Sequence, residues 1–289
     1  MDRRDVLKGM AMGAAALSLR PSLVRAADAE KAEDRLAALE RRYGGRLGVA
    51  ILDTGTGQRA GHRADERFLM CSTFKMLLAA AVLSRVDHGQ EHLDRRLVYD
   101  RQAVLEYAPV TRQHVGPPGM TLAELCSAAV SLSDNTAANV LMAHLGGPSV
   151  VTNFARQVGD SITRLDRIEP ELNRPTPEGV SDTTTPHAML GDLKTLMLGH
   201  VLSDPSRQQL TAWMLATTTG KKLVRAGVPA DWRVGEKTGS GVTQNNDVAI
   251  LWPPARKPLL VAAYYENTQK DSDGRSVVLA EVGRIVATL

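Results

Sequence analysis

The sequence has few cysteines and no long apolar run, and each shortage excludes a class of protein. Its 289 residues include only two cysteines, so a fold built on disulfides is excluded. Cys71 and Cys126 both lie in apolar helical contexts, where a buried free thiol is commoner than a disulfide, so we expect no disulfide unless the fold brings them together. The apolar run Gly9–Leu19 is about half as long as a membrane-spanning helix requires, so we predict no membrane anchor.

Residues 1–29 have the composition of a cleaved export signal. Arg3, Arg4 and Lys8 precede the apolar run, and small residues follow near the end of the segment. The adjacent arginines favour the twin-arginine type, which exports folded proteins from the bacterial cytoplasm, over a Sec signal with a chance arginine pair. We therefore expect a periplasmic or secreted protein of a bacterium.

The excess of positive charge belongs to this leader. A cut after Ala26 would remove five basic and two acidic residues from totals of 35 and 32, which leaves 30 of each sign. A nucleic-acid-binding surface is therefore not supported. A metal is not implied either, because His88 and His92 have polar flanks and Gly89 interrupts the helix between them. We predict no metal and no other cofactor.

The hydrophobic pattern of residues 30–289 predicts a single domain made of two lobes. One helix ends at Gly44-Gly45, a hairpin follows over residues 46–63, and strands return only near Arg233, before a closing helix. Neither set of strands is sufficient for a stable sheet, so the two must share one. We predict an α+β fold with a five-stranded antiparallel sheet from both chain ends, flanked by the terminal helices, and an inserted all-α lobe. The α/β lobe is expected at about 30–70 and 217–289, and the all-α lobe at about 71–216.

The segment from Ser72 to Lys75 begins a predicted helix and is the first motif that indicates chemistry. Residues three apart lie on one face of a helix, so the lysine nitrogen can lie beside the serine hydroxyl. A serine hydroxyl is a weak nucleophile until a neighbouring base takes its proton, and the positive end of the helix dipole favours negative charge that develops nearby. The spacing alone is expected by chance about once in a chain of this length.

Two further motifs follow along the chain. Ser133-Asp134-Asn135 occupies a turn between two predicted helices, where Asp134 is expected to cap a helix while its neighbours can face a cleft. Residues 237–241, Lys-Thr-Gly-Ser-Gly, lie on a predicted strand. Glycines weaken the interior of a strand and usually indicate that a ligand or another backbone comes close. A lysine, two hydroxyls and free N–H groups at such an edge suit an anionic acyl substrate.

In this order, the three motifs resemble the set found in class A β-lactamases and penicillin-binding proteins. The likeness extends to "EYAPVT", which is similar to the segment with the cleft-rim tyrosine of that family (here Tyr107). It also extends to "RLDRIEPELNR" with "SDTTTPHAM", which resemble the omega loop, and to "WRVGEKTGSG", which resembles the substrate-binding strand. The resemblance covers essentially the whole chain after the leader. It implies a class A serine β-lactamase that hydrolyses penicillin- and cephalosporin-type antibiotics and confers resistance. We expect a monomer.

The omega-loop resemblance distinguishes activities within the superfamily. It implies that Glu169 and Asn173 hold the hydrolytic water, with Glu169 as general base. Penicillin-binding proteins lack this glutamate and stay acylated, so Glu169 favours a hydrolase over two alternatives, a DD-peptidase and an acylated β-lactam sensor. Two ion pairs are also implied in the loop: Arg167 with Asp182 at its neck, and Arg164 with Asp166.

The resemblance assigns the remaining roles position by position. Ser72 is the nucleophile, and its N–H group forms the oxyanion hole with that of Ser240. Either Lys75 or Glu169 takes the serine proton during acylation. Ser133 relays a proton to the lactam nitrogen, assisted by the charge of a lysine, Lys237.

Substrate contacts are implied as well: Asn135 for the side-chain amide, Tyr107 for the rim, and Lys237, Thr238 and Ser240 for the carboxylate. Gly239, on the same strand, is also predicted to bind substrate. Many relatives add an arginine near the carboxylate. The strand after Ser240 has none here, and Arg275, at the start of the last helix and one residue out of register, is the candidate substitute.

Overall fold

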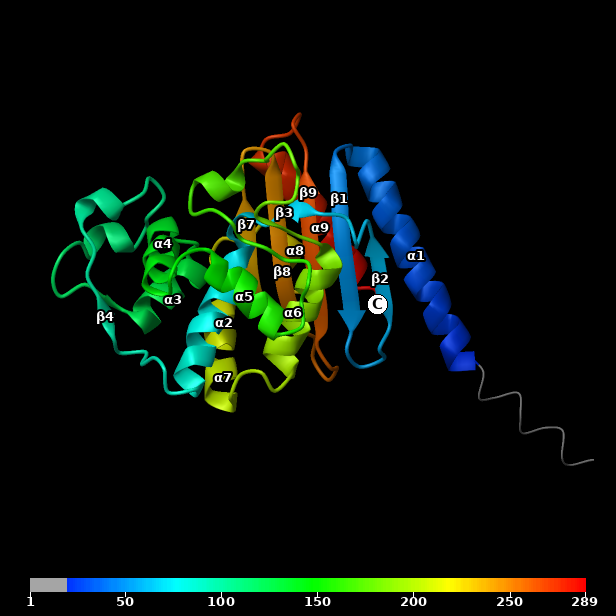
Figure 1. The fold of residues 1–289 in the computed structure, drawn as a ribbon. Coiled ribbons are helices and arrows are strands. Elements are labelled where there is room, and N and C mark those ends of the chain that lie inside the picture. Colours follow the sequence, from blue (N-terminus) through cyan, green and yellow to red (C-terminus); the bar gives the residue numbers. More distant parts are fainter. Residues whose placement is uncertain (1–19) are drawn as a thin grey trace, which may run out of the picture.

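A computed structural model describes residues 20–289, with side chains from residue 29 onward. Its centre is one five-stranded antiparallel sheet in the order β2-β1-β9-β8-β7, so strands from the two chain ends meet at β1 and β9 (Figure 1). The strands are β1 (Arg46–Asp53), β2 (Arg59–His62), β7 (Arg233–Ser240), β8 (Gln244–Trp252) and β9 (Leu259–Glu266). The predicted fold class is confirmed.

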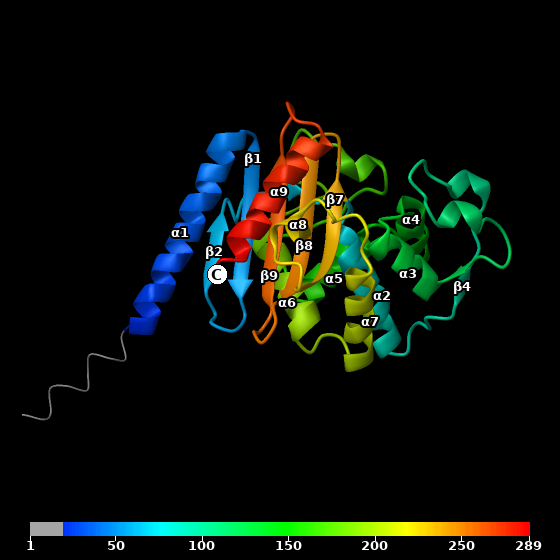
Figure 2. The same ribbon diagram turned by 180° about the vertical axis from the view of Figure 1, so that it is seen from behind.

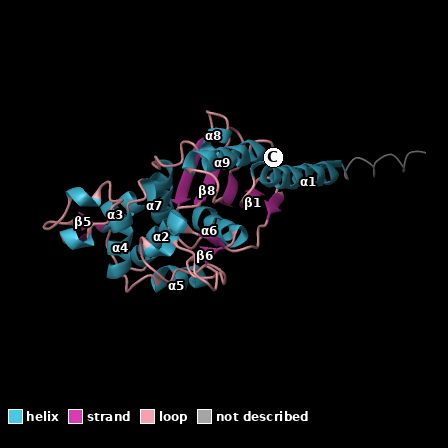
Figure 3. Ribbon diagram, turned by 90° about the horizontal axis from the view of Figure 1, so that it is seen from above, coloured by secondary structure: helices cyan, strands magenta, loops and turns pink. Residues whose placement is uncertain are grey.

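Both faces of the sheet carry apolar side chains, and helices cover each face. Along β9, Leu260, Ala262 and Tyr264 belong to the core on one face, while Val261 and Ala263 belong to the core on the other. Seen from above, the sheet lies between two layers of helices, and from behind α9 crosses it (Figures 2 and 3). The helices of the chain ends are α1 (Arg20–Tyr43), α8 (Val224–Gly227) and α9 (Ser272–Val286), and α6 (Pro186–Leu198) packs on the opposite face.

The inserted lobe is built around α2 (Phe74–Asp87). Its residues 74–83 are all buried, and a helix that is apolar on every side belongs in the middle of a bundle. It contacts the other helices of the lobe: α3 (Leu122–Ser131), α4 (Asn135–His144), α5 (Ser149–Gln157) and α7 (Asp204–Leu215).

Two small sheets were not predicted from the sequence. β3 (Phe68–Leu69) pairs with β6 (Thr183–Thr184), and β4 (Arg96–Leu97) pairs with β5 (Met120–Thr121). Strands of two residues have no alternation to detect. The β3–β6 pair has a functional consequence, because it joins the segment before Ser72 to the end of the omega loop.

The first helix begins at Arg20 and so crosses Ala26, within the predicted leader. The residues that bury it, Ala32, Leu36 and Leu39, all follow that position, so a cut after Ala26 would leave this packing in place. Most of the predicted export signal falls within residues 1–19, which lie outside the described residues. Across residues 20–289, no helix combines the length and apolarity needed to cross a membrane.

Candidate active site

Ser72 lies in a one-turn 3-10 helix, Cys71–Thr73, directly before α2. Cys71 has a φ of 44°, a left-handed conformation that non-glycine residues adopt only where the surrounding structure imposes it. Its thiol is free and buried, and burial raises the pKa of Cys71. The side chain packs beneath the β7–β8 turn, since a Cβ built on Gly241 would lie 3.2 Å from its Sγ. The thiol is therefore part of the core.

Lys75 is the centre of the hydrogen-bond network around Ser72. Its Nζ lies 2.9 Å from Ser72 Oγ, 2.6 Å from Asn135 Oδ1 and 2.9 Å from the Ser133 carbonyl oxygen. The ammonium is fully buried, and it pairs with Glu169 Oε1 at 3.0 Å. Burial lowers the pKa of Lys75, and the Glu169 carboxylate opposes that shift. A lysine with a lowered pKa beside a hydroxyl can exchange a proton with it.

Glu169 is held so that its two carboxylate oxygens have different partners. Oε1 accepts from Ser72 Oγ at 3.3 Å, and Oε2 accepts from Asn173 Nδ2 at 2.6 Å. The backbone is fixed as well, because the amide of Asn139 donates to the Glu169 carbonyl at 2.9 Å and accepts from its N–H at 3.0 Å. The carboxylate therefore reaches the nucleophile from a fixed loop position.

The omega loop is tied together by both ion pairs expected from the sequence. Arg167 Nε lies 2.6 Å from Asp182 Oδ2, and the buried Asp182 Oδ1 accepts the N–H groups of Asp166 and Arg167 at 2.8 and 2.9 Å. Arg164 pairs with Asp166. The Met70 N–H also donates to the Asp182 carbonyl at 3.0 Å, so the neck of the loop is joined to the segment before Ser72.

The turn between α3 and α4 places Ser133 opposite Lys237. Ser133 has a φ of 58°, and its Oγ lies 3.1 Å from Lys237 Nζ. Lys237 is fully buried, and burial, followed by repulsion from Lys75, holds its pKa well below the ordinary value. Asp134 is the N-cap of α4, as predicted, and its buried carboxylate also accepts from the N–H and hydroxyl groups of Thr111.

The β7 strand passes very close to the segment that carries Ser72. A Cβ on Gly239 would lie 2.7 Å from the carbonyl oxygen of Met70, so only glycine fits without a shift. Behind it, the amide of Asn246 donates to the carbonyl oxygens of Leu69 and Met70 at 2.9 and 3.1 Å. The edge of β7 and the nucleophile thus form one wall.

These groups open into a cavity of about 650 Å³. Among the residues predicted from the sequence, its lining includes Ser72, Tyr107, Ser133, Asn135, Asn173, Thr238, Gly239 and Ser240. Sequence reasoning missed others that line it, and the polar ones include Thr219, Lys222, Asn245 and Ser276. Thr219 Oγ1 lies 2.6 Å from Thr238 Oγ1 and so orients a predicted substrate contact. It belongs to a loop before β7 that carries no sequence motif.

Arg275 is not among the residues that line this cavity, so its placement gives no support to the predicted carboxylate contact. Its side chain is buried, and the guanidinium donates to Asn245 Oδ1 at 3.1 Å and to the Lys270 carbonyl. Asn245 does line the cavity, and its amide nitrogen donates to Ser276 Oγ at 3.0 Å. Arg275 therefore orients Asn245. Arg275 does not line the cavity because it lies one residue out of register, as the sequence indicated.

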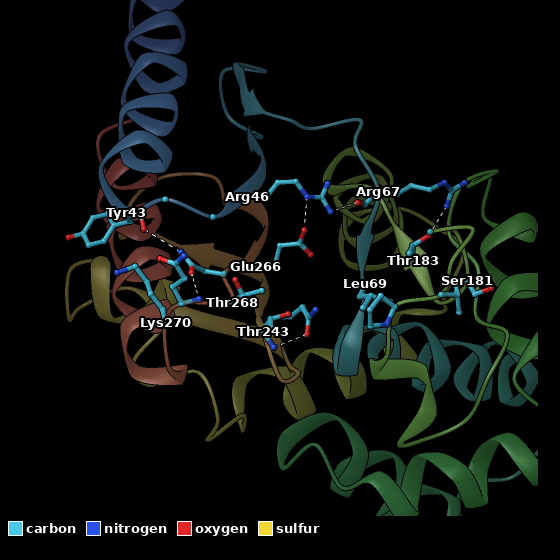
Figure 4. A pocket seen from close by; sticks show the side chains of 18 residues that line it. Tyr43, Arg46, Arg67, Leu69, Ser181, Thr183, Thr243, Glu266, Thr268 and Lys270 are labelled. Carbon is cyan, nitrogen blue, oxygen red and sulfur yellow. Dashed lines mark hydrogen bonds and ion pairs between the residues drawn. The ribbon is translucent and has the colours of Figure 1, made fainter.

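A slightly larger cavity, about 700 Å³, lies on the other side of the β7–β8 turn (Figure 4). It is bounded by Arg46, Arg67 and Glu266 and by the second half of the omega loop, and it contains neither Ser72 nor Lys75. Its arginines have partners: Arg46 pairs with Glu266 at 2.7 Å, and Arg67 donates to Thr183 Oγ1 at 3.0 Å. The candidate active site is therefore identified by its reactive side chains and not by the volume of its cavity.

A serine hydroxyl between a buried lysine and a loop carboxylate, beside the edge strand of a sheet, defines a serine enzyme of the acyl-transfer kind. The family profile described as "Beta-lactamase enzyme family" matches residues 31–288. The chain belongs to this family and is a class A serine β-lactamase. In the part of the chain that the structure describes, no three His, Cys, Asp or Glu side chains are grouped to hold a metal.

Individual relatives agree with this assignment. The chain is 45% identical over 288 residues to Beta-lactamase CTX-M-8 of Citrobacter amalonaticus, covering 99% of each chain. It is 48% identical over 255 residues to Beta-lactamase L2 of Stenotrophomonas maltophilia, covering 88% of this chain and 84% of the relative. A solved structure described as "Ancestral (GNCA) Beta-lactamase class A" superposes with a TM-score of 0.86 at 58% identity, covering 88% of this chain and 98% of the other.

Proposed function

We infer that the protein hydrolyses the β-lactam ring of penicillin- and cephalosporin-type antibiotics through an acyl-enzyme on Ser72, and so confers resistance. The observation that carries this inference is the position of one carboxylate: Glu169 contacts both Ser72, at 3.3 Å, and Asn173, at 2.6 Å. A base beside the acylated oxygen is what a hydrolase needs in order to release its product. The names of the relatives support the substrate class.

In acylation, the Ser72 oxygen attacks the lactam carbonyl carbon, and its proton passes to Lys75 or Glu169, both of which are within reach. The N–H groups of Ser72 and Ser240 stabilise the negative charge on the carbonyl oxygen. When the C–N bond breaks, Ser133 gives its hydroxyl proton to the ring nitrogen. The network regains that proton from the base that accepted the first one, so acylation leaves the protonation of the site unchanged.

In deacylation, a water held by Glu169 and Asn173 attacks the ester carbonyl carbon. Glu169 accepts the water proton, and the ester bond to Ser72 breaks as the serine oxygen is reprotonated. The clamp by Asn139 on the Glu169 backbone supports this role, because it keeps the general base at a fixed distance from the ester.

The substrate is anchored by groups on both sides of the cavity. Asn135 binds the side-chain amide, and Tyr107, half exposed at the rim, contacts the outer part of the substrate. The carboxylate is held by Thr238, Ser240 and Lys237. Lys222 lines the same cavity, where it pairs with Asp273 at 2.9 Å, so this pair adds no net charge.

Turnover of a chromogenic cephalosporin by the purified protein tests this function. We expect many turnovers per molecule. A single stoichiometric burst without further turnover would instead favour the two alternatives on the same fold, a DD-peptidase or an acylated β-lactam sensor.

We also propose that residues 1–29 direct twin-arginine export to the periplasm and that the mature protein is a monomer. Fractionation of cells that express the full chain tests the first point, and replacing Arg3 and Arg4 with lysine should retain the precursor in the cytoplasm. Light scattering of the purified mature protein tests the second.

A further inference from the structure

A third cavity, of about 680 Å³, lies in the helical lobe between the C-terminal half of α2 and α5. The two helices pack side by side (Figure 1). The cavity is at the end of α2 opposite to Lys75, so it is distinct from the cleft. Its volume is in the range of small-molecule sites, about 300–1,000 Å³.

Arg85 in this cavity has a buried donor without a partner. The guanidinium Nε is buried and has no hydrogen-bond acceptor among residues 20–289. A buried N–H group without a partner costs about 1–3 kcal/mol. Buried polar groups in folded proteins are nearly always satisfied, so an acceptor from outside the chain is indicated.

The cavity has a cation in its lining and no acidic residue. Its lining includes Arg85 and His88 but no aspartate or glutamate. The nearest acidic side chains along the chain are already engaged: Asp87 accepts from the hydroxyl of Ser203 at 2.6 Å, and Glu91 pairs with His144 at 2.7 Å. Arg85 is therefore left without a counter-charge.

The rest of the lining is part apolar and part polar, and its polar groups can serve an anion. His88 Nδ1 lies 2.7 Å from the Ser84 carbonyl oxygen, which can only accept, so Nδ1 carries the proton. Ser149, Asn153 and Gln157 contribute a hydroxyl and two amides along one side of α5. These groups can form hydrogen bonds to the remaining oxygens of an anion or to hydroxyl groups attached to it.

We propose that this cavity binds a small oxyanion of the phosphate class, inorganic phosphate or a phosphate monoester, with Arg85 as its principal contact. The planar guanidinium matches two oxygens of such an anion, and the bond is charge-assisted. Since the cavity is separate from Ser72, we expect an anion bound there to stabilise the fold and to leave the chemical step unchanged. The proposal does not depend on β-lactam hydrolysis.

The test is a titration of the whole protein with inorganic phosphate at constant ionic strength, followed by calorimetry and by thermal unfolding. Three proteins are compared: the wild type, Arg85→Met, and Lys194→Met as a control that removes an exposed cation on α6. We expect wild type and control to bind phosphate saturably and to gain at least about 2 °C in Tm, and Arg85→Met to bind at least about tenfold more weakly. Phosphate that binds to the lysines of the active-site cleft does so equally in all three proteins, so it produces no difference between them.

Equal binding and equal Tm gains in wild type and Arg85→Met would overturn the proposal. Arg85→Met removes a donor that has no partner, so we expect it to fold, and far-ultraviolet circular dichroism checks this. If it does not fold, Asn153→Leu, which replaces a polar group of the cavity by an apolar one, takes its place. Unchanged phosphate affinity in that variant would overturn the proposal equally.

Discussion

The ammonium of Lys75 and the carboxylate of Glu169 lie 3.0 Å apart, and both side chains are fully shielded from solvent. Two charges buried in this way are costly unless each has further hydrogen bonds. Lys75 has three other acceptors, and Glu169 has donors on both of its oxygens. The pair is therefore stable, and it places a proton donor and a proton acceptor on either side of one serine hydroxyl.

Ser72→Ala removes the nucleophile and should abolish hydrolysis. We expect kcat/KM for a chromogenic cephalosporin to fall at least about a thousandfold, because no other group can form the acyl-enzyme. Ser161→Ala, an exposed serine outside the cleft, is the control and should behave as wild type. A Ser72→Ala protein with substantial activity would show that the nucleophile has been misassigned.

Glu169→Ala removes the base that activates the hydrolytic water. We expect this variant to accumulate a covalent adduct on Ser72, detected by intact mass as an increase equal to the mass of the penicillin used. Glu171→Ala, two residues further along the same loop, removes an exposed carboxylate and should turn over without accumulation. Unmodified Glu169→Ala protein with normal turnover would exclude Glu169 from deacylation.

Glu40 connects α1 to the first hairpin and should make stability depend on pH in acid. Its carboxylate accepts from Arg63 Nε at 2.8 Å and from the Leu47 N–H at 2.9 Å, and Arg63 is the main reason that its pKa is lowered to about 2. A depressed carboxyl pKa contributes stability above the unfolded-state value, about 4.5, and that stability is lost as pH falls toward 2.

Glu40→Gln should therefore lower Tm near neutral pH, by an amount equivalent to about 1 kcal/mol for a partly exposed ion pair. The difference from wild type should shrink between pH 4.5 and 2. Thermal unfolding over this range, with exposed Glu33 changed to Gln as the control, measures it. A difference that stays constant with pH would contradict the assignment.

The sheet could be predicted from the sequence because strands such as β9 are long apolar runs with clear boundaries. The site triplets could be predicted because each is short and local. What could not be predicted depends on contacts between distant segments. Asn139 acts on Glu169 from 30 residues away, and Thr219 acts on Thr238 across a loop. Neither residue differs in type or spacing from an ordinary surface polar residue.

Arg275 shows the same limit in another form. Its position at the start of the last helix made it the candidate contact for the carboxylate, but side-chain direction on a helix changes by about 100° with each residue. The N-cap at Asp271 fixes the start of α9, and Ser276, the next residue, lines the cavity while Arg275 does not. A shift of one position along the helix therefore decides whether a side chain faces the cavity or orients Asn245.

Gly239→Ala tests whether the close approach of β7 to the nucleophile is needed for catalysis. The new methyl would meet the Met70 carbonyl at 2.7 Å, so β7 or the segment before Ser72 must move, and a shift of about 1 Å at a reacting centre can cost about a hundredfold in rate. We expect kcat/KM for a chromogenic cephalosporin to fall to that extent while the protein stays folded. Gly191→Ala is the control: it lies inside α6 with no atom near the new methyl, so Tm should rise slightly and activity should not change. Full activity in Gly239→Ala would mean that the oxyanion site does not depend on this contact.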